Sequence, residues 1–169
     1  MKIMKIAKAS KYNAKKETRE HIAMVKVLID GMISRLKERA SNHDKTKLES
    51  PEAEIFQEYT PKLKGTTYGS DKYKEFLKEM DVALSHHYKE NTHHPEHYKK
   101  GIEEMDLLDI FEMLCDWKAA TLRHNDGNIE KSIDINSDRF KIPAKLQKIM
   151  HNTVPTLEDI LKEHKKSKK

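Results

Sequence analysis

The segment EEMDLLDIFEMLCDWKAATLRH, residues 103–124, has the strongest helical pattern in the chain. Their apolar side chains recur every three or four positions, which is typical of an amphipathic helix. The segment NDGN follows at once and is expected to end the helix, because glycine and asparagine favour turns. One long helix is therefore expected here, with other helical segments before and after it.

Helical spacing also marks the regions on both sides of this stretch. In residues 16–39, His21, Val25, Leu28 and Met32 step by four, three and four positions. His21 is therefore expected on the inward face, near the start of that helix. Further helices are predicted over 51–60, from Ser70 or Asp71 to about 89, over 137–150 and over 156–165.

Local signals agree with an all-helical chain. Ser50, Pro51 and Glu52 are typical of a helix start, with a capping hydroxyl, a proline in the first turn and an acid beside it. Pro143 is expected to weaken or kink the helix that contains it. Glycine is scarce and no segment resembles a β-hairpin. We expect an all-α fold, a compact bundle of about six to seven helices.

Size and charge indicate a single domain with basic ends. The chain has 169 residues, of which 36% are hydrophobic and 36% charged, and its net charge is +5. The positive charge is concentrated at the two ends, so we expect a basic flexible tail over 1–15, one helical domain over 16–165 and a short basic tail over 166–169. The tails are expected to be solvated, and nucleic acid is not an expected partner.

Several classes of protein are excluded by composition. Cys115 is the only cysteine, which excludes disulfide scaffolds and zinc knuckles, and its apolar helical setting indicates a buried structural thiol. No stretch approaches the roughly 18 apolar residues of a membrane span. The N-terminus lacks the apolar region of a secretory signal. We expect a cytoplasmic protein, in the host cytoplasm if it is encoded by a phage.

Histidine is concentrated in one short segment. SHHYKENTHHPEH, residues 85–97, holds five of the ten histidines. His43 and Asp44 are adjacent after the first helix, and Asp116 lies within an apolar helix, where a carboxylate needs a cation. Imidazole and carboxylate together suit zinc, iron, manganese or cobalt. One helix cannot surround a metal, so a site would need ligands from several helices.

Each of these residues also has a structural explanation that the sequence leaves open. His21 could be a core histidine, and Asp44 could cap the following helix. His93 and His94 could form an exposed turn beside Pro95. Asp116 could pair with Arg123 or Lys118.

The order of these residues resembles the HD-domain superfamily of metal-dependent phosphohydrolases, in which a histidine, a His-Asp pair and a later aspartate share an all-helical scaffold. The matching residues are His21, His43-Asp44 and Asp116, chosen over Asp106 and Asp109 because of its apolar setting. The extra histidines resemble the two-metal branch of that superfamily. REHI (19–22), NHDKTKL (42–48), HHYKENTHHPEH (86–97) and DLLDIFEMLCDWKAA (106–120) look like a family of uncharacterised phage and bacterial proteins, over about 17–153.

The resemblance implies a metal centre with one or two divalent transition-metal ions (Mn, Fe, Co or Zn). Asp44 would bridge two ions, and His87, His93 or His94 would complete the second site or protonate the leaving oxygen. Lys45, Lys47 and Arg123 are the expected phosphate contacts, and Asn91 would bind substrate or hold its turn. The implied metal ligands are His21, His43, Asp44, His87, His93, His94 and Asp116.

The expected activity follows from the same resemblance. We expect a metal-dependent phosphohydrolase that acts on a nucleotide or another small phosphate ester through a metal-activated water. The glycine-tyrosine-proline segment of the cyclic-dinucleotide branch is absent, so that substrate is not expected. The alternatives are an HD-fold di-iron oxygenase and a non-enzymatic phage or bacterial helical module with a structural metal.

Overall fold

The computed structural model describes residues 13–67, 70–123 and 127–168. Within these ranges the chain is all-α, as predicted, with seven α-helices, three short 3-10 helices and no strand. It divides into two units, Met1–Glu38 and Arg39–Lys169, and each is described by itself. The predicted basic tail over 1–15 falls outside the described residues as far as position 12.

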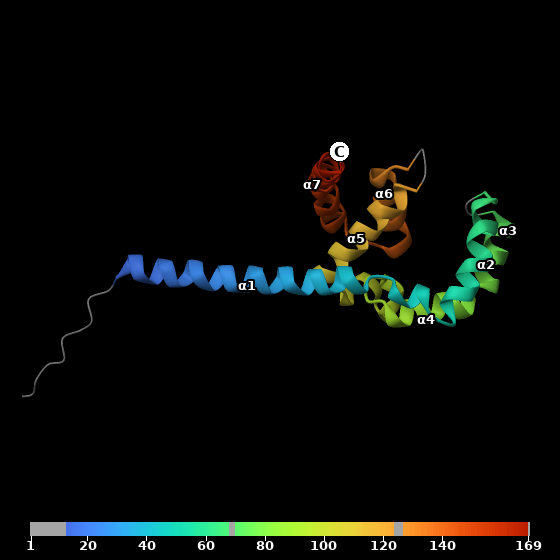
Figure 1. The fold of residues 1–169 in the computed structure, drawn as a ribbon, viewed down its shortest axis with the longest axis horizontal. Helices are drawn as coiled ribbons and strands as arrows, with labels where there is room; N and C mark the ends of the chain where they lie inside the picture. The colour runs from blue at the N-terminus through green and yellow to red at the C-terminus, as the bar shows by residue number, and fades with distance from the viewer. Residues whose placement is uncertain (1–12, 68–69, 124–126, 169) are drawn as a thin grey trace, which may run out of the picture. The chain divides into compact units, whose positions relative to one another are not determined.

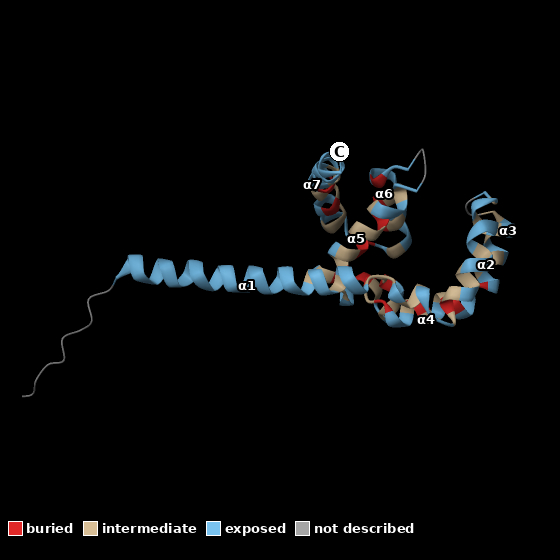
Figure 2. Cartoon of the chain, viewed as in Figure 1, coloured by how far each residue is buried: buried red, intermediate tan, exposed pale blue. Residues whose placement is uncertain are grey.

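The described residues of the first unit, from residue 13 on, form most of helix α1 (Ala14–Asn42), which is longer at both ends than the predicted 16–39. The Asn13 side chain accepts a hydrogen bond from the Lys16 amide at 3.0 Å, which explains the earlier start. No residue of α1 is buried, and Figure 2 shows the helix exposed along most of its length. Leu28, expected on an inward face, is 64% exposed. Within the described part of this unit, no second helix covers the apolar side of α1.

The second unit begins with the last turn of α1, from Arg39, which is followed by a 3-10 turn, η1 (Lys45–Leu48), and three α-helices. The first of them, α2 (Glu52–Lys64), continues past the predicted end at residue 60 and includes Pro61. The single helix predicted to reach residue 89 is instead two, α3 (Asp71–Glu79) and α4 (Asp81–Glu90), separated at Met80. Ser70 caps α3 as predicted, since its hydroxyl accepts from the Tyr73 amide at 3.2 Å.

Two short 3-10 turns precede the helix that has the strongest helical pattern in the sequence. They are η2 (Pro95–His97) and η3 (Gly101–Glu104), and α5 (Leu107–Thr121) follows them. The predicted start at residue 103 is therefore wrong. Asp106 caps the helix, because its Oδ1 accepts from the Asp109 amide at 2.9 Å while Asp109 Oδ2 accepts from the Asp106 amide at 3.0 Å. This reciprocal cap fixes the start of α5.

The C-terminal boundaries differ most from prediction. Instead of helices over 137–150 and 156–165, the chain forms α6 (Ile129–Phe140) and α7 (Ala144–Ser167). Pro143 does not kink a helix; it precedes α7, where its fixed φ and missing N–H are harmless. α7 also continues through Pro155 and into the predicted 166–169 tail.

The main core lies among α5, α6 and α7, which pack against one another (Figure 1). Trp117 of α5 stacks on Phe140 of α6, with ring centroids 6.3 Å apart. Cys115 is half-buried and free, and burial raises the pKa of its thiol. Among the described residues, no helix is long and apolar enough to cross a membrane. The buried apolar residues of this core are Ile102, Met113, Leu114, Trp117, Ile129, Ile133, Ile142, Met150, Val154 and Leu157.

Candidate metal centre

The candidate site lies in the second unit and draws its side chains from three places. Asp44 follows the end of α1 and has a positive φ of 55°, a conformation that aspartate tolerates better than most residues. His87 lies in the last turn of α4, and His93 and His94 follow in the turn before η2. Asp116 projects from α5. Segments distant in sequence therefore contribute to one cluster of titratable groups.

One group of possible metal ligands consists of Asp44, His87, His93 and His94, whose donor atoms all lie within 4.8 Å of one another. Asp44 Oδ1 lies 3.4 Å from His87 Nε2 and 3.5 Å from His93 Nε2. The Nε2 atoms of His87 and His94 are 2.9 Å apart. Two donors bound to one ion at about 2.1 Å lie roughly 3.0–3.4 Å apart, so these spacings suit a shared cation.

A second group consists of His43, Asp44 and Asp116. His43 Nε2 lies 3.6 Å from Asp44 Oδ2 and 3.6 Å from Asp116 Oδ1. The two oxygens of Asp44 therefore face different groups: Oδ1 faces the histidines of α4 and its following turn, and Oδ2 faces His43. A carboxylate in this position can bridge two ions.

Two further carboxylates hold the imidazoles from behind. Glu52 is fully buried, and its oxygens accept from His86 Nδ1 at 2.7 Å and His87 Nδ1 at 2.8 Å. Glu112 lies 2.8 Å from His43 Nδ1 and 3.4 Å from His93 Nδ1. A proton held on Nδ1 leaves the lone pair of Nε2 free for a metal. Glu112 also joins His43 and His93 as a third possible ligand group, but it contacts their Nδ1 atoms.

The histidines differ in protonation. Burial lowers the pKa of His94 to about 3, and burial followed by the charge of Lys47 lowers the pKa of His87. Both rings are therefore neutral near pH 7 and available as ligands. Asp116 and Glu112 raise the pKa of His43 to about 10. A cation at the second group would have to displace the proton that His43 holds.

Both aspartates of the site are ionised. Burial by itself would raise the pKa of Asp44, but His93 and Lys47 hold it well below its ordinary value. Burial likewise opposes ionisation of Asp116, and contact with His43 outweighs it and lowers the pKa.

Two buried polar atoms at the centre of the cluster lack a hydrogen-bond partner within the described part of the chain. They are Asp44 Oδ1 and His93 Nε2. Buried polar atoms are rarely left unpaired, because each costs the free energy of its desolvation. A cation between these two atoms would satisfy both, so the residues present fit a divalent metal.

The structure brings together six of the seven predicted metal ligands. His21 is the exception, since it lies exposed on α1 in the first unit, and its role stays a prediction. Of the three candidate aspartates, Asp106 caps α5, and Asp109 accepts from Arg39 at 2.6 Å and from the Tyr98 hydroxyl at 2.7 Å. Only Asp116 belongs to a ligand group.

The structure does not support the purely structural roles that the sequence left open for Asp44, His93 and Asp116. The Asp44 side chain makes no capping hydrogen bond to η1. His93 is only 2% exposed, so it is not part of an exposed turn. Asp116 faces His43, whereas Lys118 pairs with Glu158.

The predicted substrate contacts are placed less uniformly. Lys47 Nζ lies 2.6 Å from Asp44 Oδ2, at the edge of the cluster. Lys45 is exposed, with its Nζ 3.5 Å from Asn42 Oδ1, and Arg123 is exposed just beyond α5. Asn91 is buried and donates to Thr46 Oγ1 at 3.0 Å and to the His87 carbonyl at 2.8 Å. Asn91 therefore holds the turn that carries the histidines.

Sequence reasoning missed Glu52 and Glu112 as site residues. In the sequence, Glu52 resembles any acid in the first turn of a helix, a position that the helix dipole favours. Glu112 carried a usable signal, because it precedes Asp116 by four residues and so lies on the same side of α5.

Comparison with known proteins identifies the family of this chain. No curated protein and no solved structure matches the chain. Residues 10–163 match DUF5662, a family of unknown function. Since this match covers most of the 169 residues, the chain belongs to the DUF5662 family.

Proposed function

We propose that this protein is a metal-dependent phosphohydrolase that acts on a nucleotide or another small phosphate ester. One observation carries the proposal: the two oxygens of Asp44 face two different groups of possible ligands. Paired ions on either side of a shared carboxylate are the arrangement that phosphatases and nucleases use for in-line displacement at phosphorus. The resemblance of the ligand order to the HD-domain superfamily supports the same activity.

The residues would divide into two ion sites. His87, His93, His94 and Asp44 Oδ1 would hold one ion, and His43, Asp116 and Asp44 Oδ2 the other. Mixed imidazole and carboxylate donors favour manganese, iron, cobalt or zinc. A divalent metal supplies Lewis acidity, which acidifies a water ligand and offsets charge on phosphoryl oxygens.

The residues also leave room for substrate and water. The second group has three protein donors, fewer than a closed structural site needs, so at least one coordination position stays open. This favours an enzyme over a module with a structural metal. Lys47 would contact the phosphoryl group, because its ammonium already neighbours Asp44.

The orienting residues would keep the donors in place. Glu52 would hold His87, and Glu112 would hold His43 and His93, through their Nδ1 atoms. Arg39 fixes Glu112 in turn, since its Nε donates to Glu112 Oε2 at 2.6 Å. Such partners determine which nitrogen of each ring points toward the ion.

The test is metal analysis followed by an activity screen. The chain is purified without a histidine tag, its metal content is measured by mass spectrometry, and phosphate release from a panel of nucleotides and phosphate esters is measured with added Mn²⁺ or Co²⁺. Asp44→Asn should lose bound metal and activity. Asp159→Asn, on the exposed side of α7, serves as the matched control and should lose neither.

The same donor set suits iron, so a di-iron oxygenase is the alternative. Metal analysis together with the activity screen distinguishes it from a phosphohydrolase. Two irons accompanied by oxygen uptake, without phosphate release from any substrate, would overturn the phosphohydrolase proposal in favour of an oxygenase. Full metal retention by Asp44→Asn would overturn the metal centre itself.

A further inference from the structure

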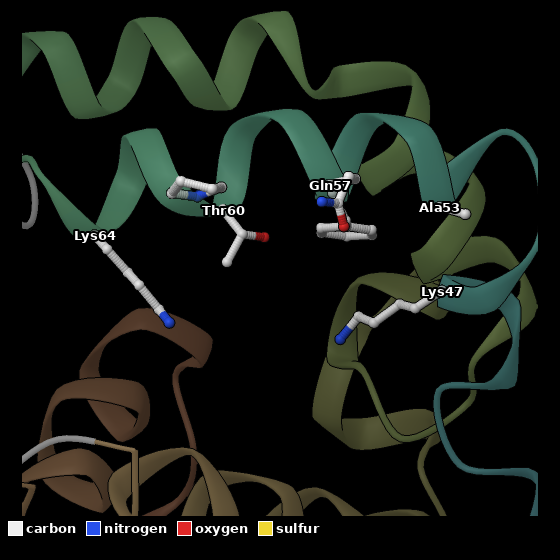
Figure 3. A pocket seen from close by; sticks show the side chains of 7 residues that line it. Lys47, Ala53, Gln57, Thr60 and Lys64 are labelled. Atoms are coloured by element: carbon white, nitrogen blue, oxygen red, sulfur yellow. The ribbon is translucent and has the colours of Figure 1, made fainter.

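A cavity of about 400 Å³ lies along one side of α2, next to the candidate metal centre. Figure 3 shows the Lys64 and Lys47 side chains extending toward this cavity at its two ends, with Gln57 and Thr60 between them. Phe56 also lines the cavity. The walls therefore combine two ammonium groups, an amide, a hydroxyl and an aromatic ring.

One end of this cavity adjoins the possible ligands directly. Lys47 Nζ lies 2.6 Å from Asp44 Oδ2 and 5.5 Å from the centre of the Phe56 ring. The Phe56 ring in turn meets the His87 ring edge to face, with centroids 6.2 Å apart. The phosphoryl group of a substrate at the metal centre would thus lie close to the Lys47 end of the cavity. The rest of the substrate would then extend along α2.

The other end of the cavity is positively charged. Among the described residues, Lys64 has no carboxylate partner, and no acidic side chain lines the cavity. Lys62, two residues earlier on the same helix, is different: its Nζ lies 2.6 Å from Glu58 Oε1 and 4.1 Å from the centre of the Tyr59 ring. Lys64 is therefore available to a ligand, whereas Lys62 is already paired.

We propose that this cavity binds the leaving group of the substrate and selects one with a flat ring and a second negative charge. The ring would lie against Phe56, Gln57 and Thr60 would donate or accept hydrogen bonds, and the distal anion would bind Lys64. This inference rests on the proposed function, because the metal centre positions the phosphoryl group. It narrows the substrate class to phosphate esters whose leaving group is itself anionic.

Two simple substrates test the selection. Phenyl phosphate has the ring alone, and 4-carboxyphenyl phosphate carries an anion at the far side of the ring. For the Mn²⁺-loaded protein, KM should be about fivefold lower for 4-carboxyphenyl phosphate, as expected for one partly exposed ion pair. Lys64→Gln should abolish this difference in KM between the two substrates. Lys62→Gln should preserve the difference. If the ratio of KM for phenyl phosphate to KM for 4-carboxyphenyl phosphate is the same in Lys64→Gln and Lys62→Gln, the inference is wrong.

A non-hydrolysable ligand separates failure of the cavity from failure of the enzyme. Binding of 4-carboxybenzylphosphonate to the Mn²⁺-loaded protein is measured by calorimetry, with circular dichroism to confirm that both variants fold. Lys64→Gln should weaken binding about fivefold and Lys62→Gln should not. If Lys64→Gln alone weakens phosphonate binding but no ester is hydrolysed, the cavity binds the ligand as inferred and the phosphohydrolase proposal is refuted. Absence of phosphonate binding, or equal affinity in the two variants, would refute the cavity.

Discussion

Glu52 offers the sharpest test of how the imidazoles are held. It is fully buried, and its two oxygens accept from His86 Nδ1 at 2.7 Å and from His87 Nδ1 at 2.8 Å. Glu52→Gln keeps the shape of the side chain but replaces one acceptor oxygen by an N–H₂ donor. If that donor faces His87, the ring must move its proton to Nε2, the atom that faces Asp44.

The size of the effect follows from the role of such partners. Replacing a group that orients a metal ligand weakens metal binding about 10–100-fold, which corresponds to about 1.4–2.7 kcal/mol. If the amide turns its oxygen to His87, the tautomer survives and only the negative charge is lost. We therefore expect a loss of metal affinity near 10-fold when the amide oxygen faces His87, and a loss near 100-fold when the amide nitrogen faces it.

The assay is competition for Zn²⁺ with a chromophoric chelator at neutral pH. Glu54→Gln is the matched control, because Glu54 is exposed two residues further along the same helix. Thermal unfolding of both metal-free variants checks that they fold. Zinc affinity of Glu52→Gln equal to that of Glu54→Gln would refute the claim that Glu52 orients a ligand.

Three further predictions concern the shared carboxylate, the titration of the histidines and the independence of the core. Asp44→Asn should bind no metal and Asp116→Asn one equivalent, as measured by mass spectrometry, because Asp44 contributes to both groups; equal metal content in the two variants would contradict this. In the metal-free protein the raised pKa of His43, about 10, stabilises the fold fully below pH 6.5, and this contribution is lost as the pH rises toward 10. The lowered pKa of His94, about 3, gives the opposite pH dependence. Its contribution to the stability of the fold is present above pH 6.5 and is lost as the pH falls toward 3. In urea unfolding, the difference in unfolding free energy between wild type and His43→Gln should therefore decrease as the pH rises. The difference between wild type and His94→Gln should decrease as the pH falls. Differences that do not change with pH would contradict both expectations. Ile133→Ala should lower the unfolding free energy by about 2–5 kcal/mol, because Ile133 is fully buried, while zinc affinity stays unchanged in the folded protein.

The candidate ligands were predictable from residue type and order. Imidazoles at 43, 87, 93 and 94 and a carboxylate inside an apolar helix are unusual in a chain this polar, and the structure brings them together. The orienting carboxylates were harder to predict. Glu52 resembles any acid in a helix first turn, and only the packing of α2 against α4 brings it to His87.

Helix boundaries followed local chemistry that periodicity does not detect. The break at Met80 separates two segments that share one apolar pattern, so spacing alone joined them. At the C-terminus, Pro143 was expected to disturb a helix but instead precedes one, and Asn128, whose side chain accepts from the Lys131 amide at 3.0 Å, begins α6 earlier than predicted. The inward face predicted around His21 is not tested, because α1 is described apart from the second unit.

Anomalous diffraction from crystals grown with Mn²⁺ would locate the ions of the proposed metal centre. The proposed two-ion site predicts two manganese peaks, one on each side of Asp44 and about 3.5–4 Å apart. The first is expected among His87, His93 and His94, and the second beside His43 and Asp116. A peak elsewhere on the surface with none at Asp44 would contradict this prediction, as would a single ion that leaves Asp44 uncoordinated.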